Sequence, residues 1–596
     1  MENRQIDPLQ IIGMVLIFGI FTWMMYNQPV PDLETTATAT TAAVEQQDPV
    51  QTIATDTAKQ AAPAAAAVSV VADTLSLQND VLSIGISTKG GVMTQVALKE
   101  LVNYQDEPLY LIDNDNNSLN IAFTTVSGQL FQTKFMMFTP SVSNTSDGQE
   151  LRLRAPFDTD GYIELVYTLP KDGYRFGFEV VAEGIEGALD PSIPAAFSWR
   201  MDGFRHAKSA QYENRYTQLA YNHKSDKFST LSAAGDDDED LKNVGWVSYR
   251  QHFFSSILIP ENPFEVAAVT SSTITDEEEE ESEFLKAFTT ETTLPYSRNR
   301  FQANFDWYMG PTDYEVLKNY DESLYESISF GWGLIGWINR SVFYPLFSML
   351  SGVVPQGIAI ILLTIIVRLV LSPVLYKSYV SQAKMRVLRP EITALNEKYK
   401  NDATKRQQET MKLYSKAGAS PMAGCIPALI QMPVFFALFY FFPIAYEMRG
   451  KSFLWAKDLS SYDMIAELPF TIPFYGDHVS LFPLLASVAI FFYTQMTAGQ
   501  QMQPSQPGMP NMKYIMYLMP VMMLFFFNNY ASGFSLYYFV SNVLMIGIML
   551  VIKNVIIDQD KIHAQIEENK KKPKKQNRFQ RKMSELMEEA ERQKKA

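Results

Sequence analysis

A single arginine stands inside a long apolar segment. Arg368 lies about two-thirds of the way along Val354–Tyr376, roughly 10 Å from the end of a helix at 1.5 Å per residue. A cation at that depth in a bilayer costs several kcal/mol unless water, a partner or snorkelling relieves it. Snorkelling is the simpler alternative, but Lys377 and Lys384 already follow the segment as end anchors. Because no carboxylate lies inside the other C-terminal apolar segments, we expect a hydrated cavity around Arg368.

Further polar side chains are suited to line such a cavity. Thr364 precedes Arg368 by four residues, so both lie on one helix face. The other apolar segments carry polar residues at Gln431, Ser487, Gln495, Tyr537, Tyr538, Ser541 and Asn542. Each of these alone is more often a hydrogen bond between helices. Together with Arg368 they predict a polar lining.

The elements that must position these residues are membrane spans. Apolar runs of suitable length and aromatic ends occur at Leu9–Met25, Val354–Tyr376, Ile426–Tyr446, Leu481–Thr497, Tyr514–Asn528 and Phe534–Ile552. Segment 1–29 is predicted to be an uncleaved anchor, because the residues after it do not form the small-residue cleavage site of a signal peptide. The other five runs predict a five-span core over residues 354–552.

The orientation follows from the Lys/Arg residues in the loops. Residues 377–421 carry ten and the tail 553–596 carries thirteen, against three in 447–478 and none in 529–533. We therefore expect 377–421, the N-terminus and the C-terminus in the cytoplasm and residues 27–350 outside. Within the cytoplasmic loop, Asn401–Asp402 predicts the turn of a helical hairpin at the membrane surface.

The outer region divides into three parts. Residues 30–74 are rich in Thr, Ala, Gln and Pro and predict a disordered tether. Residues 75–325 show recurring strand-length apolar runs, which predict a large all-β sandwich. Residues 326–353, with Trp332 and Trp337, predict an interfacial amphipathic helix, the alternative being an extension of the next span.

Charge is distributed unevenly along the chain. Residues 27–330 carry 20 Lys/Arg against 46 Asp/Glu, including the runs Asp236–Asp240 and Glu277–Glu281. These runs lack the spacing of a calcium loop, so solvated loop charge is the preferred interpretation. The tail has a basic cluster of Lys570, Lys571, Lys572, Lys574, Lys575, Arg578, Arg581 and Lys582. Such a block attracts ribosomal RNA phosphates or anionic lipid, unless it serves only as a topology determinant.

Enzymatic chemistry has little support. The 596 residues include one cysteine, Cys425, and five scattered histidines. Gly450-Lys451-Ser452 is not a phosphate-binding loop, because Ala445 stands where the first glycine is required. Patterns of nucleophilic or zinc hydrolases do not stand out. We therefore expect neither an enzyme nor a cofactor or metal site.

Three stretches resemble the YidC membrane protein insertases, relatives of the mitochondrial and chloroplast inner-membrane insertases. They are Thr364–Arg368 (TIIVR), Met422–Phe435 (MAGCIPALIQMPVF) and Ser532–Asn542 (SGFSLYYFVSN). The anchor and the large outer domain are similar to the Gram-negative form, so the outer compartment would be the periplasm. The resemblance covers essentially the whole chain.

This resemblance implies a fold, a function and partners. It implies a five-span core whose hydrophilic groove opens to cytoplasm and lipid but not to the periplasm, and a periplasmic β-supersandwich like that of sugar mutarotases. Arg368 matches the groove arginine, and Thr364 and Tyr538 match positions that contact the inserting chain. The implied activity is insertion and chaperoning of nascent inner-membrane proteins, alone or with the Sec translocon, whereas the ribosome is a partner that only the basic tail suggests.

Two other classes remain open from the sequence. A small-solute transporter would usually show paired repeats, which we do not find. A membrane-anchored carbohydrate-binding or sugar-epimerising domain would need a histidine and carboxylate in one pocket. His206, His223 and His252 are available, but their spacing does not support it.

Overall fold

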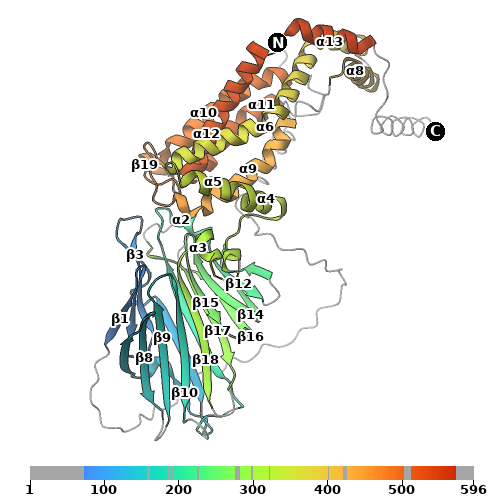
Figure 1. Cartoon of the computed structure of the whole chain (residues 1–596). Coiled ribbons are helices and arrows are strands. Elements are labelled where there is room, and N and C mark those ends of the chain that lie inside the picture. The colour runs from blue at the N-terminus through green and yellow to red at the C-terminus, as the bar shows by residue number, and fades with distance from the viewer. Residues whose placement is uncertain are drawn as a thin grey trace, which may run out of the picture. The chain divides into compact units, whose positions relative to one another are not determined.

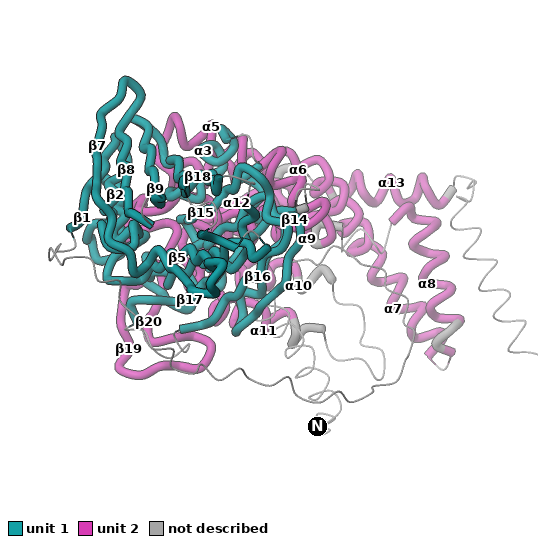
Figure 2. Tube along the Cα trace, turned by 90° about the horizontal axis from the view of Figure 1, so that it is seen from below, with its two compact units in different colours: residues 1–329 teal, residues 330–596 magenta. Residues whose placement is uncertain are grey.

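The computed structural model describes twelve stretches of the chain in two compact units. The stretches are residues 73–157, 161–184, 188–190, 192–223, 227–274, 282–296, 300–320, 323–400, 402–419, 426–501, 512–556 and 558–571. The units divide after Ser329 (Figure 2). The predicted anchor 1–29, the tether up to residue 72, the acidic run 277–281 and the tail beyond Lys571 lie outside the described residues.

The first unit is built from two antiparallel sheets (Figure 1). The smaller sheet runs β1 (Thr74–Gln78), β2 (Leu82–Ser87), β3 (Met93–Val102), β4 (Pro108–Ile112). The larger sheet has 14 strands. Its path is β6 (Leu130–Gln132), β5 (Asn117–Thr124), β11 (Ala195–Phe204), β17 (Phe284–Leu294), β16 (Phe264–Thr273), β14 (Asp237–Gln251), β15 (Phe254–Pro260), β18 (Phe301–Pro311), β10 (Arg175–Glu183), β9 (Tyr162–Pro170), β8 (Gly148–Pro156), β7 (Thr139–Asn144). Strand β12 (Thr217–His223) pairs with β14 and with β13 (Lys227–Thr230).

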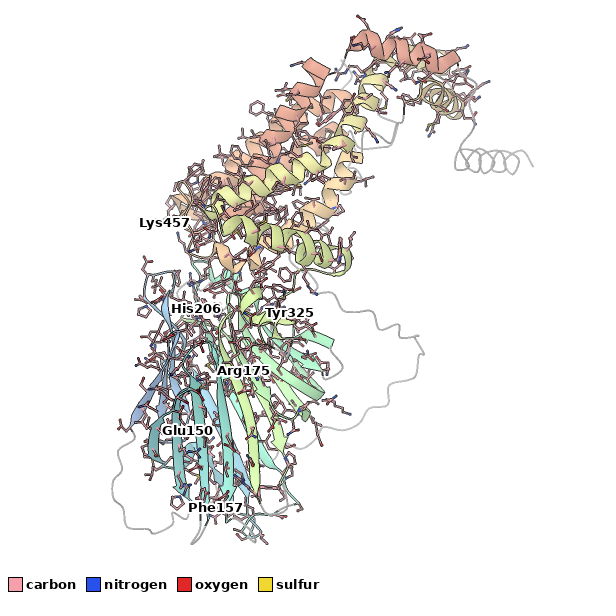
Figure 3. The ribbon with its side chains drawn as sticks, viewed as in Figure 1. Glu150, Phe157, Arg175, His206, Tyr325 and Lys457 are labelled. Atoms are coloured by element: carbon pink, nitrogen blue, oxygen red, sulfur yellow. The ribbon has the colours of Figure 1, made fainter. Side chains whose placement is uncertain are left out.

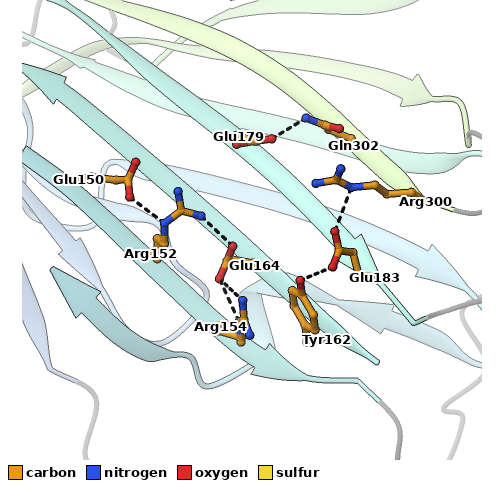
Figure 4. Close-up of polar contacts among 9 residues, drawn as sticks. All are labelled: Glu150, Arg152, Arg154, Tyr162, Glu164, Glu179, Glu183, Arg300 and Gln302. Atoms are coloured by element: carbon orange, nitrogen blue, oxygen red, sulfur yellow. Dashed lines mark hydrogen bonds and ion pairs between the residues drawn. The ribbon is translucent and has the colours of Figure 1, made fainter. Parts of the chain in front are cut away.

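Alternating side chains explain why these segments form a layered sheet. In β8, Leu151 and Leu153 are buried while Arg152 and Arg154 are exposed, as period-two strands require. The exposed face carries a ladder of polar pairs, in which Arg152 and Arg154 both bond Glu164 on β9 (Figure 4). The core includes large aromatic side chains from different strands, with Trp199 stacked on Tyr249 at 3.7 Å between ring centroids. The predicted large β-sandwich is confirmed.

The acidic run Asp236–Asp240 differs from the expectation of a loop. Strand β14 begins at Asp237, which pairs in register with Ser271 of β16. The carboxylates of Asp236 and Asp237 accept backbone N–H bonds from Thr273 and Ser232 at 2.8 and 2.6 Å. The charges stay at the surface, but backbone pairing between distant strands outweighs the low strand propensity of aspartate.

The second unit is helical. Its elements are α4 (Gly333–Ile338), a π-helical turn at Asn339–Phe343, α5 (Tyr344–Ser351), α6 (Gln356–Val387), α7 (Arg389–Lys398), α8 (Ala403–Ala417), α9 (Ile426–Ile444), α10 (Leu481–Gln501), α11 (Met512–Phe527), α12 (Ser532–Val551) and α13 (Gln559–Lys571), with a hairpin of β19 (Met464–Ile472) and β20 (Gly476–Ser480) between α9 and α10. Helices α6 and α9 to α12 coincide with the five predicted spans. By length and composition α6 and α12 can cross a membrane, and α9, α10 and α11 contain shorter apolar stretches.

One boundary, between the first core span and the cytoplasmic hairpin, differs from the sequence expectation. Helix α6 continues to Val387, so residues 377–387 extend a span instead of opening the hairpin. Pro373 inside α6 does not end it, as membrane helices tolerate proline. The hairpin itself is α7 and α8, and Asp402 caps α8 by accepting the Lys405 N–H at 2.9 Å.

The segment before α6 has the predicted helical and amphipathic character. In this segment Trp332, Leu334 and Trp337 are exposed, while Phe343 and Phe347 are buried. The Asn339 side chain donates to the carbonyl oxygens of Phe330 and Ala437, both at 2.7 Å, which attaches this segment to α9. The helix ends at Ser351 and α6 begins at Gln356, so the segment is not an extension of the next span.

Candidate functional site: a buried arginine between spans

The guanidinium of Arg368 is held by two other helices. Arg368 is about 18 Å along α6 from Gln356 at 1.5 Å per residue, and it is 6% exposed. Its Nε donates to Ser541 Oγ of α12 at 2.8 Å, and Nη2 bonds the same hydroxyl oxygen. Its Nη1 donates to Gln431 Oε1 of α9 at 2.7 Å. One side chain therefore connects α6, α9 and α12.

A tyrosine completes this polar cluster, which we define as Arg368, Gln431, Tyr537 and Ser541. Gln431 Nε2 lies 3.5 Å from the hydroxyl of Tyr537, a fully buried residue of α12. The partners of Arg368 are all neutral, and among the described residues no carboxylate forms an ion pair with it. The expectation that no carboxylate compensates the charge of Arg368 agrees with the described part of the structure.

The hydrogen bonds use only part of the capacity of the arginine. A guanidinium carries five N–H donors, and three of them point to Gln431 and Ser541. Buried N–H groups are normally satisfied by protein or water. The residues that the structure describes supply no hydrogen-bond acceptor for the other two donors of Arg368.

The other predicted groove residues lie near the cluster but bond locally. Thr364 is fully buried one turn before Arg368, and its hydroxyl donates to the Ile360 carbonyl at 2.7 Å. The Asn542 side chain donates to the Tyr538 carbonyl at 2.7 Å. The ring of Tyr538 packs against Phe435 of α9, with centroids 5.7 Å apart.

Of the remaining polar positions, two on α10 do not join the cluster. Gln495 is exposed and Ser487 is buried, and the described hydrogen bonds link neither of them to Arg368. Two tyrosines that we did not predict, Tyr379 of α6 and Tyr493 of α10, pack together in a hydrophobic cluster between the spans. Tyr379 follows Arg368 by 11 residues, about three helical turns, so helical periodicity could have identified it. Tyr493 carries no such signal.

The first basic residue of the tail cluster is already paired within the chain. Helix α13 packs on α8 and on the end of α6 through Leu388, Tyr414, Ile562 and Ile566. Lys570 Nζ bonds Glu391 Oε1 of α7 at 2.8 Å and Glu567 Oε1 at 3.0 Å. The hydrogen bond that Lys570 donates to the Glu391 carboxylate raises the pKa of Lys570. Lys571 ends α13, and the other six basic residues lie outside the described residues.

The histidines of the β unit do not form a sugar site of the kind considered above. The buried carboxylate of Glu213 accepts the backbone N–H groups of His206 (Figure 3) and Ala207, at 2.9 and 2.7 Å from Oε2. The ring of His252 stacks on Phe253 with centroids 3.8 Å apart. Glu213 therefore stabilises the backbone of the loop at His206 and Ala207.

A β-sandwich followed by a five-helix apolar core with a buried cationic cluster defines a class of inner-membrane proteins. Residues 74–345 match the family described as YidC periplasmic domain, and residues 347–561 match the 60Kd inner membrane protein family. The chain is 38% identical to the membrane protein insertase YidC of Parabacteroides distasonis, over 86% of this chain and 82% of that one. It is 33% identical to the insertase of Porphyromonas gingivalis, over 99% and 98%.

The chain belongs to the YidC family of membrane protein insertases. It is therefore an inner-membrane insertase with a periplasmic domain, it acts on nascent membrane proteins, and the expectation that it is not an enzyme is confirmed. A putative aldose 1-epimerase from Escherichia coli is a weak structural neighbour at 10% identity, covering 40% of this chain and 99% of that one with a TM-score of 0.28.

Proposed function

We propose that the polar cluster around Arg368 is the groove through which the polar flank of a nascent segment crosses part of the bilayer. The observation that carries this proposal is a buried guanidinium, among apolar helices, with neutral partners and two unused donors. Such a group attracts acidic residues and water. It lowers the cost of bringing a polar flank into the membrane, which would otherwise be several kcal/mol per charge.

The apolar part of the substrate supplies the driving force. Leu369 and Val370 follow Arg368 on α6 and are exposed, so apolar surface lies beside the cluster. A segment that has its flank in the groove slides along this surface into lipid. Its burial gains about 25 cal/mol per Å² of apolar area, so no bound fuel is required.

The groove opens toward the cytoplasm and is closed toward the periplasm. In support, Arg368 is about 18 Å from the periplasmic start of α6, which leaves about 12 Å of a 30 Å hydrocarbon core on the other side. At the periplasmic end, the backbone N–H groups of Ser532 and Gly533 donate to the carbonyls of Ser461 and Leu459 at 2.7 and 2.9 Å. These bonds attach the start of α12 to the loop after α9.

The same reasoning orients the whole chain. The periplasmic domain precedes α6, so α7, α8 and α13 at its far end lie in the cytoplasm. We propose that both termini are cytoplasmic and that residues 27–350 are periplasmic. Cooperation with the Sec translocon and its accessory subunits is proposed from the family resemblance alone.

Crosslinking to stalled nascent chains tests the groove. A photo-reactive residue is placed at Thr364, Gln431, Tyr538 or Asn542, and an exposed residue of α10, Val488, serves as the control. Ribosome-bound chains of increasing length should crosslink to the first set as their hydrophobic segment emerges. Crosslinking at Val488 as strong as at Thr364 and Gln431 would contradict the proposal.

We further propose that the basic tail binds the translating ribosome, with anionic lipid as its competing partner. Lys570 is paired with Glu391, so the contribution should come mainly from Lys571 and the six cations after it. Replacing those six by glutamine keeps the length of the tail. In detergent without anionic lipid, ribosome co-sedimentation should weaken and the slope of log affinity against log salt should flatten by up to about 4. Equal affinity and slope would exclude the ribosome role.

A further inference from the structure

The β19–β20 hairpin and the loop before it expose large apolar side chains. Phe474 is 74% exposed, Leu454 70% and Phe470 61%, and Ile465 is exposed as well. We call these four residues the apolar rim. A group of exposed side chains this large marks an interaction surface more often than isolated ones do.

The base of the hairpin is rigid, so the exposed groups are held in place. Asn528, fully buried at the end of α11, donates to the carbonyls of Tyr475 and His478 at 2.8 and 2.7 Å. Its own side-chain oxygen accepts the Ser480 N–H at 2.9 Å. Asp463 accepts the Phe482 N–H at the start of α10 at 2.7 Å. A network of this kind fixes the hairpin to two spans.

The rim lies at the outer ends of the membrane helices. Tyr475, next to Phe474 in the turn, packs on Phe525 of α11 with ring centroids 5.3 Å apart. At the other end of the rim, Phe453 lies against Gly357, the second residue of α6. In the chain, α6 follows the periplasmic domain and begins at Gln356, so the end of α6 that Phe453 contacts is its periplasmic end.

Two rim residues adopt a backbone conformation that side chains rarely choose. Phe474 has φ +66° and Leu454 has φ +53°, both in the left-handed region that favours glycine or asparagine. Such strain persists where surrounding structure imposes it, and it is frequent at functional positions. At Leu454 the surrounding structure is a tight turn, closed by backbone hydrogen bonds between Phe453 and Ala456 at 2.9 and 3.0 Å, which holds the exposed side chain in a fixed position.

We propose that the apolar rim inserts into the periplasmic leaflet of the bilayer and fixes the depth of the core helices there. Lipid is the expected partner of the rim, because the residues next to it, Phe453 and Tyr475, contact the spans α6 and α11. The charged residues near the rim also favour lipid. Lys451 and Lys457 are exposed in the same loop as Leu454, and lysines beside aromatic groups suit the phosphate and acyl boundary.

Depth-dependent fluorescence quenching tests the insertion in the full-length protein. Cys425 is replaced by serine, and single cysteines at Phe470, Phe474, Glu467 and Val142 are labelled with an environment-sensitive fluorophore. Glu467 is an exposed residue of the same hairpin and Val142 an exposed residue of β7. In phospholipid vesicles, spin labels near the lipid headgroup should quench positions 470 and 474 at least twofold more than 467 and 142. Aqueous iodide should show the opposite order.

The result that overturns the proposal is iodide quenching at 470 and 474 as strong as at 142. A domain, a second copy or a substrate covering the rim would instead give protection from both iodide and lipid-borne quenchers, which also refutes lipid insertion.

A pair of substitutions checks the role of the side chains without unfolding the hairpin. Phe474→Asn suits the left-handed conformation, so it removes the ring while keeping the backbone. Combined with Phe470→Ser, it should lower lipid quenching of a label at Ile465 at least twofold, with an unchanged melting temperature. Thr471→Ser, an exposed position between the two, is the matched control. Undiminished lipid quenching in the double variant would refute the proposal.

Discussion

Replacing Arg368 by methionine should impair insertion while leaving the protein folded. Each hydrogen bond from the charged guanidinium to Gln431 or Ser541 contributes about 1.5–3 kcal/mol. Burying the charge costs several kcal/mol, which methionine does not incur. The two effects oppose each other and are similar in size. We therefore expect the free energy of unfolding to change by no more than about 2 kcal/mol.

The effect on a substrate with an acidic flank should be larger. A carboxylate about 5 Å from the guanidinium gains about 3 kcal/mol at an effective dielectric constant of 20. Arg368→Met removes that attraction, a factor of about 100 in the equilibrium for occupying the groove. Arg368→Glu turns it into repulsion and should be worse, whereas Arg368→Lys keeps the charge and should retain part of the activity.

The assay is insertion into vesicles that contain the purified variant. Two substrates are compared that differ only in a translocated tail with Asp and Glu or with Asn and Gln. The loss should be concentrated on the acidic tail. Normal insertion of the acidic tail by Arg368→Glu would refute the electrostatic role, and equal loss for both tails would show that Arg368 acts only on structure.

Three further predictions concern other parts of the chain. A chain that joins residues 1–29 directly to 326–596 should complement loss of the full protein, because the polar cluster lies entirely after residue 330; a stable, correctly oriented but inactive product would contradict this. Ile566→Asp should release α13 from α8 and the end of α6, since Ile566 is 1% exposed in their shared core; hydrogen exchange of α13 should rise, unlike in the surface control Lys561→Asp. Burial lowers the pKa of Lys286 from 10.5 to about 8, so the unfolded chain binds the extra proton between these values and stability rises with pH across that window. Lys286→Met should remove this rise and raise stability at pH 7 by up to about 3 kcal/mol, measured by thermal unfolding, and an unchanged pH slope would count against it.

The five apolar helices of the core and the class of the outer domain could be predicted from the sequence alone. A helix that spans lipid must pair its own backbone polar groups and expose apolar side chains to hydrocarbon. The composition of a segment of about 20 residues is therefore enough to predict whether it forms such a helix. For strands, the alternation of Leu151 and Leu153 with Arg152 and Arg154 is a comparable local pattern, and it predicts which side chains face the core. Arg368 could also be identified as a candidate site residue from the sequence, because a charged residue within an apolar segment is a local feature.

The hydrogen-bond partners of the Arg368 guanidinium, in contrast, follow only from the tertiary structure. Ser541 lies 173 residues and Gln431 63 residues from Arg368, and nothing in their spacing pairs them. The same holds for Lys570 with Glu391, 179 residues apart, and for Asn528, which closes the hairpin at Tyr475. Hydrogen bonds and ion pairs depend on distances of about 3 Å and on direction. Segments far apart in the chain reach such distances only when whole helices pack, and that packing is a property of many side chains at once.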